Sequence, residues 1–170
     1  MSEWVGLDGV NGDGNLIQAG IDEKLNPSTG LFSITPWWEI LPATEQPINM
    51  DVSVGDQITV EVWQIGGTTW GIQLTDETTG QAFSTSQQYY GEGNTVDYVV
   101  EAPTDPATGG VYELADYTPA VSFTNLRFNG TQSSLVEDIL VQQGVQVSTP
   151  SSLTSSGFDV NYGADAPSQP

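Results

Sequence analysis

The chain of 170 residues contains no histidine and no cysteine, so its chemistry must come from other side chains. A Ser-His triad, a thiol nucleophile, a disulfide and a Cys/His zinc site are therefore excluded. Any catalysis has to use carboxylates, amides, hydroxyls or a metal ion bound by oxygen atoms.

Two strand-like segments place such groups on one face. In residues 16–22, LIQAGID, alternation along a strand puts Gln18 and Asp22 on the same side, with an apolar opposite side. In the segment PWWEIL, Trp37 and Glu39 lie together on one side for the same reason. Each segment thus carries a polar or acidic residue on one face and has an apolar opposite face that must be buried.

A third segment, residues 95–101 with the sequence TVDYVVE, places Asp97 and Glu101 on one face. If the three segments share a sheet, Gln18, Glu39 and Glu101 converge on a concave surface lined by tryptophan. The competing interpretation is that these are ordinary outward-facing polar residues of a half-buried sheet.

Short alternating runs separated by Gly, Asn, Asp and Pro dominate the chain, a pattern typical of an all-β sandwich or barrel. Residues 76–80 read as a hairpin loop that ends in a glycine. Residues 134–142 read equally well as a helix or a strand, and Asn129-Gly130 reads as a turn. The other expected strands are 57–65, 69–75, 81–86, 121–128, 144–148 and 158–162.

The composition limits the partners of the protein. The chain has 22 Asp and Glu but only 2 Lys and Arg, for a formal net charge of -20. It can neither neutralise a phosphate backbone nor approach an anionic membrane, so we expect no nucleic-acid and no membrane partner. The N-terminal MSEWVGLDG lacks a signal-peptide pattern. The chain is therefore either cytosolic or a mature form. An acidic, base-poor composition fits acid-secreted or halophilic proteins, and of these alternatives we expect a secreted protein.

The length predicts one domain, which we place at residues 1–163, followed by a disordered tail at 164–170. The loop Asp8–Asn15, DGVNGDGN, has oxygen ligands that suit calcium. Its spacing fails the EF-hand pattern, however, because position 12 of that loop would be Ala19. A Gly/Asn turn between two strands is the better interpretation, and we expect no metal site.

Seven segments, in order along nearly the whole chain, resemble the glutamic peptidases (eqolisins, peptidase family G1). Trp4–Gly9 is similar to the family's W-V-G-I-D-G, residues 16–22 to I-L-Q-T-G-x-D, and residues 97–101 to E-F-I-I-E. The remaining similar segments are 37–39, 54–58, 74–81 and 116–125.

The resemblance implies an antiparallel β-sandwich of two curved sheets, a concanavalin- or lectin-like jelly roll, with its cleft on the concave sheet. It also implies an acid endopeptidase that needs no cofactor and acts on polypeptides, with Gln18 and Glu101 as the catalytic pair. Trp4, Asp8, Asp22, Trp37 and Glu39 become substrate-binding or supporting residues, and Trp37 and Trp38 are expected to bind extended peptide.

A Glu/Gln pair can supply every group that peptide hydrolysis needs. Glu101 would act as the base for water and then as the acid for the leaving amine, while the Gln18 amide would donate to the oxyanion. A carboxylate is most useful as a base near its own pKa of about 4, which favours acid conditions.

Family members carry some tens of residues before the W-V-G motif, in some cases as a separate light chain, so a separate N-terminal chain or strand is a possible partner. Two other functions stay open. One is a non-catalytic lectin-like module that binds sugar or peptide. The other is a glycosidase using Glu39 and Glu101, which would not need the amide of Gln18.

Overall fold

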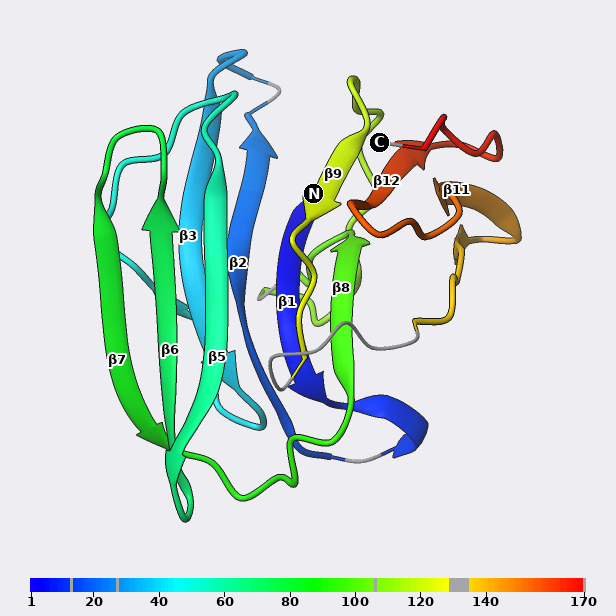
Figure 1. Cartoon of the computed structure of the whole chain (residues 1–170). Helices are drawn as coiled ribbons and strands as arrows, with labels where there is room; N and C mark the ends of the chain where they lie inside the picture. The colour runs from blue at the N-terminus through cyan, green and yellow to red at the C-terminus, as the bar shows by residue number, and fades with distance from the viewer. Residues whose placement is uncertain (13, 27, 106, 129–134, 170) are drawn as a thin grey trace. The chain divides into compact units, whose positions relative to one another are not determined.

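A computed structural model describes residues 1–12, 14–26, 28–105, 107–128 and 135–169. These residues form an all-β fold of antiparallel sheets, with a single 3-10 turn at Val10–Gly12 (η1) (Figure 1). No helix in the described ranges is long and apolar enough to span a bilayer. The chain forms two compact units: Ser2–Val99, the N-terminal unit, and Met1 with Val100–Pro170, the C-terminal unit.

The N-terminal unit contains two sheets. The larger sheet has the strand order β4-β3-β2-β1-β8, and β8 sits at its edge beside β1 (Figure 1). The smaller sheet has the order β5-β6-β7. The strands of the larger sheet are β1 (Ser2–Asp8), β2 (Leu16–Leu25), β3 (Phe32–Ile40), β4 (Gln46–Pro47) and β8 (Val96–Glu101). The last two residues of β8, Val100 and Glu101, belong to the C-terminal unit. Those of the smaller sheet are β5 (Ile58–Gly66), β6 (Thr69–Asp76) and β7 (Ala82–Gln88).

Alternating apolar side chains bring these two sheets together. Along β2, Ile17, Ala19 and Ile21 are buried, and β2 contacts both β5 and β6. In β6, the side chains of Ile72 and Leu74 are fully buried, each 0% exposed. A strand with one apolar face must cover it, so the N-terminal unit is a two-layer sandwich. The face of β2 that carries Gln18 is the opposite one.

The hairpin between β6 and β7 is held by one buried carboxylate. Asp76 accepts hydrogen bonds from the backbone amides of Thr78 at 2.8 Å and Thr79 at 3.1 Å, and from the Thr79 hydroxyl at 2.5 Å. Gly80 closes the loop with a φ of 79°, which a glycine adopts without strain. The Thr79 hydroxyl is the main cause of a lowered Asp76 pKa, and the backbone amides add to it against the opposing effect of burial.

The C-terminal unit is a four-stranded sheet with the order β10-β11-β12-β9. Its core is a cluster of Ala102, Leu114 and Val147, with Tyr117 and Leu140 packed against it. The strands are β9 (Val121–Thr124), β10 (Leu140–Gln142), β11 (Val145–Pro150) and β12 (Gly157–Tyr162).

The predicted all-β sandwich is confirmed, and the strand extents differ only in detail. The strand expected at 121–128 ends at Thr124, because Asn125 turns the backbone with a φ of 56°. In the ambiguous segment 134–142, the described residues form a strand only at Leu140–Gln142. The predicted Asn129-Gly130 turn lies outside the described residues. Residues 164–169 form no strand, and their disorder stays a prediction.

Candidate active site

Strand register brings the amide of Gln18 and the carboxylate of Glu39 together. Gln18 of β2 lies directly opposite Glu39 of β3 and, on its other side, Gly6 of β1. Directly paired residues of antiparallel strands project from the same face of a sheet. Gly6 keeps space open there: a Cβ at this position would lie 3.2 Å from the Gln18 Cβ.

The hydrogen bond between these side chains fixes the orientation of the amide. Gln18 Nε2 donates to Glu39 Oε2 at 2.6 Å. Because a Glu39 oxygen accepts this bond, the NH₂ end of the amide faces Glu39 and Gln18 Oε1 points away. Gln18 is 7% exposed, and its Oε1 has no hydrogen-bond partner among the described residues. A buried polar atom without a partner indicates that a ligand or water completes the site.

Two tryptophans flank the next position along β2. Gly20 is paired with Trp4 on one side and Trp37 on the other, so both indoles share the face of Gln18. A side chain at position 20 could not fit, because a Cβ there would lie 2.6 Å from the Trp4 Cβ and 2.1 Å from the Glu3 backbone oxygen. Trp37 Nε1 is buried and finds no acceptor within the described ranges.

Trp38 does not belong to this face. Trp38 is paired with Ala19, whose side chain lies on the apolar face of β2. The expectation that Trp38 joins Trp37 in binding peptide is therefore wrong, because neighbouring residues of a strand point to opposite sides.

Asp22 completes an acidic group on the Gln18 face. It is 1% exposed, and the Lys24 Nζ lies 2.8 Å from its Oδ2. This contact is an ion pair without hydrogen-bond geometry, since neither Asp22 oxygen has a hydrogen-bond partner in the part of the chain described. Burial, with the negative charges of Asp22 and Glu39, raises the pKa of the nearby Glu45, against the opposing charge of Lys24.

Asp8 has a different environment from the other site candidates. Its Oδ2 accepts from the Tyr89 hydroxyl at 2.6 Å and the Gly93 amide at 2.8 Å, and its Oδ1 from the Asn94 amide at 3.1 Å. Burial raises the pKa of Asp8, but these bonds and one to Thr95 more than offset it, so the pKa is lowered. Asp8 thus anchors the segment that leads into β8, and its contact with substrate stays a prediction.

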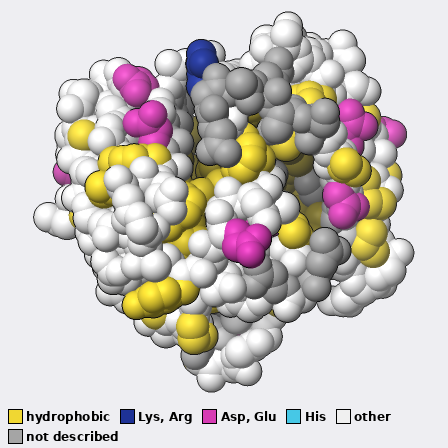
Figure 2. All heavy atoms as spheres, turned by 60° about the horizontal axis from the view of Figure 1, so that its bottom comes forward, with side chains coloured by type: hydrophobic (Ala, Val, Ile, Leu, Met, Phe, Trp, Pro, Cys, Tyr) yellow, Lys and Arg dark blue, Asp and Glu magenta, His cyan; other side chains and the backbone are white. Residues whose placement is uncertain are grey.

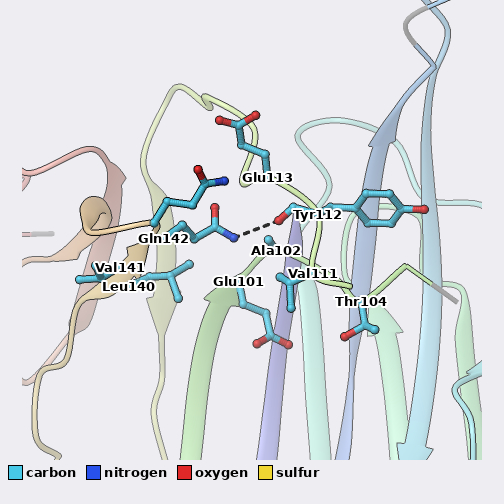
Figure 3. A pocket seen from close by; sticks show the side chains of 10 residues that line it. Glu101, Ala102, Thr104, Val111, Tyr112, Glu113, Leu140, Val141 and Gln142 are labelled. Atoms are coloured by element: carbon cyan, nitrogen blue, oxygen red, sulfur yellow. Dashed lines mark hydrogen bonds between the residues drawn. The ribbon is translucent and has the colours of Figure 1, made fainter. Parts of the chain in front are cut away.

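Glu101 ends β8 and belongs to the C-terminal unit. It is partly buried and lines a pocket of about 460 Å³ with residues of the same unit (Figure 3). Gln18 belongs to the N-terminal unit, so the meeting of these two side chains stays a prediction. No group of three acidic side chains suited to a metal ion occurs in the described ranges.

Sequence reasoning missed two supporting residues. Tyr89 holds Asp8 from 81 positions away, and no local pattern marks such a contact. Gln142, which lines the pocket of Glu101, lies at the end of the segment 134–142, which read equally well as a helix or a strand. Both act through pairings between distant segments.

Comparison with known proteins supports the motif analysis. Aspergilloglutamic peptidase from Aspergillus niger has the same fold, with a TM-score of 0.80 and 23% identity over 95% of this chain and 97% of that chain. Scytalido-glutamic peptidase, solved with a transition state analog inhibitor, gives a TM-score of 0.77 and 21% identity over 95% and 82%. SCP-B, a member of the Eqolisin family solved with the tripeptide Ala-Ile-His, gives 0.68 and 20% over 95% and 81%.

No curated protein matches the chain. The model of the Peptidase A4 family, by contrast, matches residues 1–162 of the 170. The chain therefore belongs to the Peptidase A4 family, the glutamic peptidases that its motifs resemble.

Proposed function

We propose that this protein is an endopeptidase that hydrolyses peptide bonds with the amide of Gln18 and the carboxylate of Glu101. The observation that carries the proposal is the state of the buried Gln18 amide. Glu39 fixes its orientation at 2.6 Å, and its Oε1 has no hydrogen-bond partner in the described ranges. Membership of the Peptidase A4 family supports the same chemistry.

The amide has the hydrogen-bonding capacity that this reaction requires. A primary amide has two N–H donors and one acceptor oxygen. Glu39 uses one N–H of Gln18, which leaves the second N–H and Oε1 for the reaction. Oε1 would accept a hydrogen bond from the attacking water, and the second N–H would donate to the carbonyl oxygen as it becomes an oxyanion. One such oxyanion donor lowers a barrier by about 3 kcal/mol.

Glu101 would move the proton. As a carboxylate it takes a proton from the water while the water oxygen bonds to the scissile carbonyl carbon. The protonated acid then gives that proton to the amide nitrogen as the C–N bond breaks, and the carboxylate is restored. This cycle consumes one water and releases a new carboxyl end and a new amino end.

The substrate class follows from the family and the Gln18 face. SCP-B, which shares the fold, was solved with a tripeptide, and we infer that a polypeptide also binds here. Trp4 and Trp37 flank Gly20 on this face, and both side chains are largely buried, at 8% and 4% exposed. A carboxylate base works best near its pKa of about 4, so we extend the proposal to a secreted enzyme that works in acid.

Hydrolysis of denatured casein at about pH 4, with a pepsin-type inhibitor present, tests the proposal. The wild type should cleave casein, while Glu101→Gln and Gln18→Ala should lose nearly all activity with unchanged far-UV circular dichroism. Glu61→Gln and Gln64→Ala, at exposed positions of β5, are matched controls that should remain active.

Full activity in either Glu101→Gln or Gln18→Ala would reject the assignment of the pair. A folded wild type that cleaves nothing across the pH range would instead favour a non-catalytic binding module built on the same fold.

A further inference from the structure

A pocket lies beside Glu101, and the proton transfers of the proposed reaction do not need it. It measures about 460 Å³, and all of its lining residues belong to the C-terminal unit. This volume is within the range of about 300–1,000 Å³ found for small-ligand sites. Figure 3 shows Glu101, Val111 and Leu140 around the same space.

Apolar side chains make up much of the lining. Ala102 and Leu140 belong to the core cluster of this unit or pack against it, so one side of the pocket is continuous with that core. Val111 is 65% exposed and Val141 is 50% exposed, although both are β-branched apolar residues. A pocket with apolar walls binds an apolar side chain most favourably, because binding removes the apolar surfaces of the pocket and of the bound side chain from water.

The opposite wall is held in place by the side chain of Gln142. Gln142 Nε2 donates to the backbone oxygen of Tyr112 at 2.9 Å, and Gln142 Oε1 accepts from the backbone amide of Leu114 at 2.9 Å (Figure 3). Both ends of this amide are thus used on backbone groups. Gln142 fixes the distance between β10 and the segment that carries Val111.

The segment on that wall has further supports of its own. Thr104 and Val111 form an isolated antiparallel bridge, and the Tyr112 amide donates to the Pro103 oxygen at 3.0 Å. The segment with Val111 is thus paired with residues 103–104, just after Glu101, and the Gln142 side chain ties β10 to that same segment.

We propose that this pocket is a substrate subsite that takes an apolar side chain close to the peptide bond that is cleaved, with Gln142 as the positioning residue of its wall. The proposal rests on the proposed function, because Glu101 is the group that would act on that bond. Residues of an extended peptide are about 3.3 Å apart, so a residue next to the bond lies within reach of a pocket that Glu101 lines. The carboxylates of Glu101 and Glu113 in the lining disfavour an acidic guest.

Binding can be measured without turnover, which separates this proposal from the peptidase assignment. The probes are the N-acetyl amides of Phe, Leu, Lys and Asp, added to wild-type protein labelled at the methyl groups of Val and Leu. The Phe and Leu probes should shift the methyl resonances of Val111 and Leu140, and the Asp probe should not. Shifts confined to other methyl groups, no shifts at all, or a stronger response to Lys than to Phe would overturn the proposal, whether or not the protein cleaves casein.

Gln142 is tested by two substitutions with different expected pH dependence. Gln142→Leu removes both backbone hydrogen bonds and should weaken binding of the Phe probe about tenfold at every pH. In Gln142→Glu, a protonated carboxyl can donate and accept, so binding should approach wild type below about pH 4 and weaken towards pH 7. Equal binding by both variants at both pH values would show that Gln142 does not position the wall.

A charge placed in the pocket provides a kinetic test. Val111→Asp should lower kcat/KM at least tenfold for peptides that place Phe or Leu at the cleaved bond, and less for peptides with Lys there. Val136→Asp, at a residue that is 93% exposed and outside the pocket lining, is the matched control and should leave the preference unchanged. An unaltered preference in Val111→Asp would contradict the assignment of the subsite.

Discussion

The carboxylate of Glu39 determines how the amide of Gln18 is turned. Without an acceptor-only neighbour, the two ends of a glutamine amide can exchange by rotation about the last side-chain bond, and only one orientation presents the oxygen to water. The 2.6 Å hydrogen bond holds that orientation. We therefore expect Glu39 to act through Gln18 rather than on the substrate.

Replacing Glu39 should therefore slow catalysis without abolishing it. A hydrogen bond to a charged group contributes about 1.5–3 kcal/mol, so Glu39→Ala should lower kcat by about 10- to 100-fold. Glu39→Gln keeps an acceptor oxygen and should recover part of that loss. Steady-state kinetics at about pH 4 measures both variants. Identical rates in Glu39→Ala and the wild type would show that the hydrogen bond has no role in catalysis.

The faces on which the site candidates lie could be predicted from the sequence, because alternation along a strand is a local property. Period-two patterns place Gln18 with Asp22, and Trp37 with Glu39, each pair on one side of its own strand. The direct contact between Gln18 and Glu39 could not be predicted, because it depends on the register between strands. The same limit concealed the bond from Tyr89 to Asp8, which spans 81 positions.

Close packing of β1 on β2 depends on Gly20. A methyl group at this position would meet the Glu3 backbone oxygen at 2.1 Å, and a backbone atom cannot turn away as a side chain can. Gly20→Ala should destabilise the protein by about 1–3 kcal/mol or more, as overpacking does. Gly66→Ala in β5 is the matched control, because no atom lies within 4 Å of its added Cβ. Urea unfolding of both variants measures the difference, and equal midpoints would contradict this packing.

The hairpin of β6 and β7 should make stability depend on pH through Asp76. Its pKa is lower in the folded protein than in the unfolded chain, where it is about 3.9. The stabilisation is therefore present above about pH 4 and is lost as the pH falls through the folded pKa.

Asp76→Asn should accordingly melt below the wild type at about pH 7, and the difference should shrink as the pH falls below about 4. Glu77→Gln, in the same loop, is the control. Thermal unfolding across the pH range measures both variants. A difference that grows on acidification would mean that the sign of the Asp76 contribution is wrong.

The strands themselves were largely predictable, and the exceptions have local causes. Residues 16–22, 57–65 and 69–75 alternate clearly, and each is a strand in the structure. The strand expected at 121–128 stops at Thr124 because Asn125 adopts a positive φ. The pocket of Glu101 could not be predicted from the sequence. Its lining comes from segments near 102, 111 and 141, and no sequence pattern shows that these segments lie together.

Over the whole molecule, acidic residues far outnumber basic ones. The formal net charge is -20, and the carboxylates on the face in Figure 2 are spread over the surface rather than gathered in one patch. Such a chain repels itself at neutral pH, and this repulsion falls when carboxylates take up protons.

Salt should therefore stabilise the protein at neutral pH and have little effect in acid. Raising NaCl from about 0.01 M to about 1 M shortens the screening length from about 30 Å to about 3 Å, which weakens repulsion between exposed carboxylates. The Tm should rise by several degrees at about pH 7 and change much less near pH 4, where many carboxylates are protonated. A Tm that falls with salt at pH 7 would contradict self-repulsion as the main charge effect.

The central claim is that Gln18 of the N-terminal unit and Glu101 of the C-terminal unit act on one water molecule. A crystal structure of the protein grown at about pH 4 tests it most directly. We expect one ordered water within about 2.5–3.2 Å of both Gln18 Oε1 and a Glu101 carboxylate oxygen. A structure in which the two side chains open onto separate surfaces and share no water would contradict the claim.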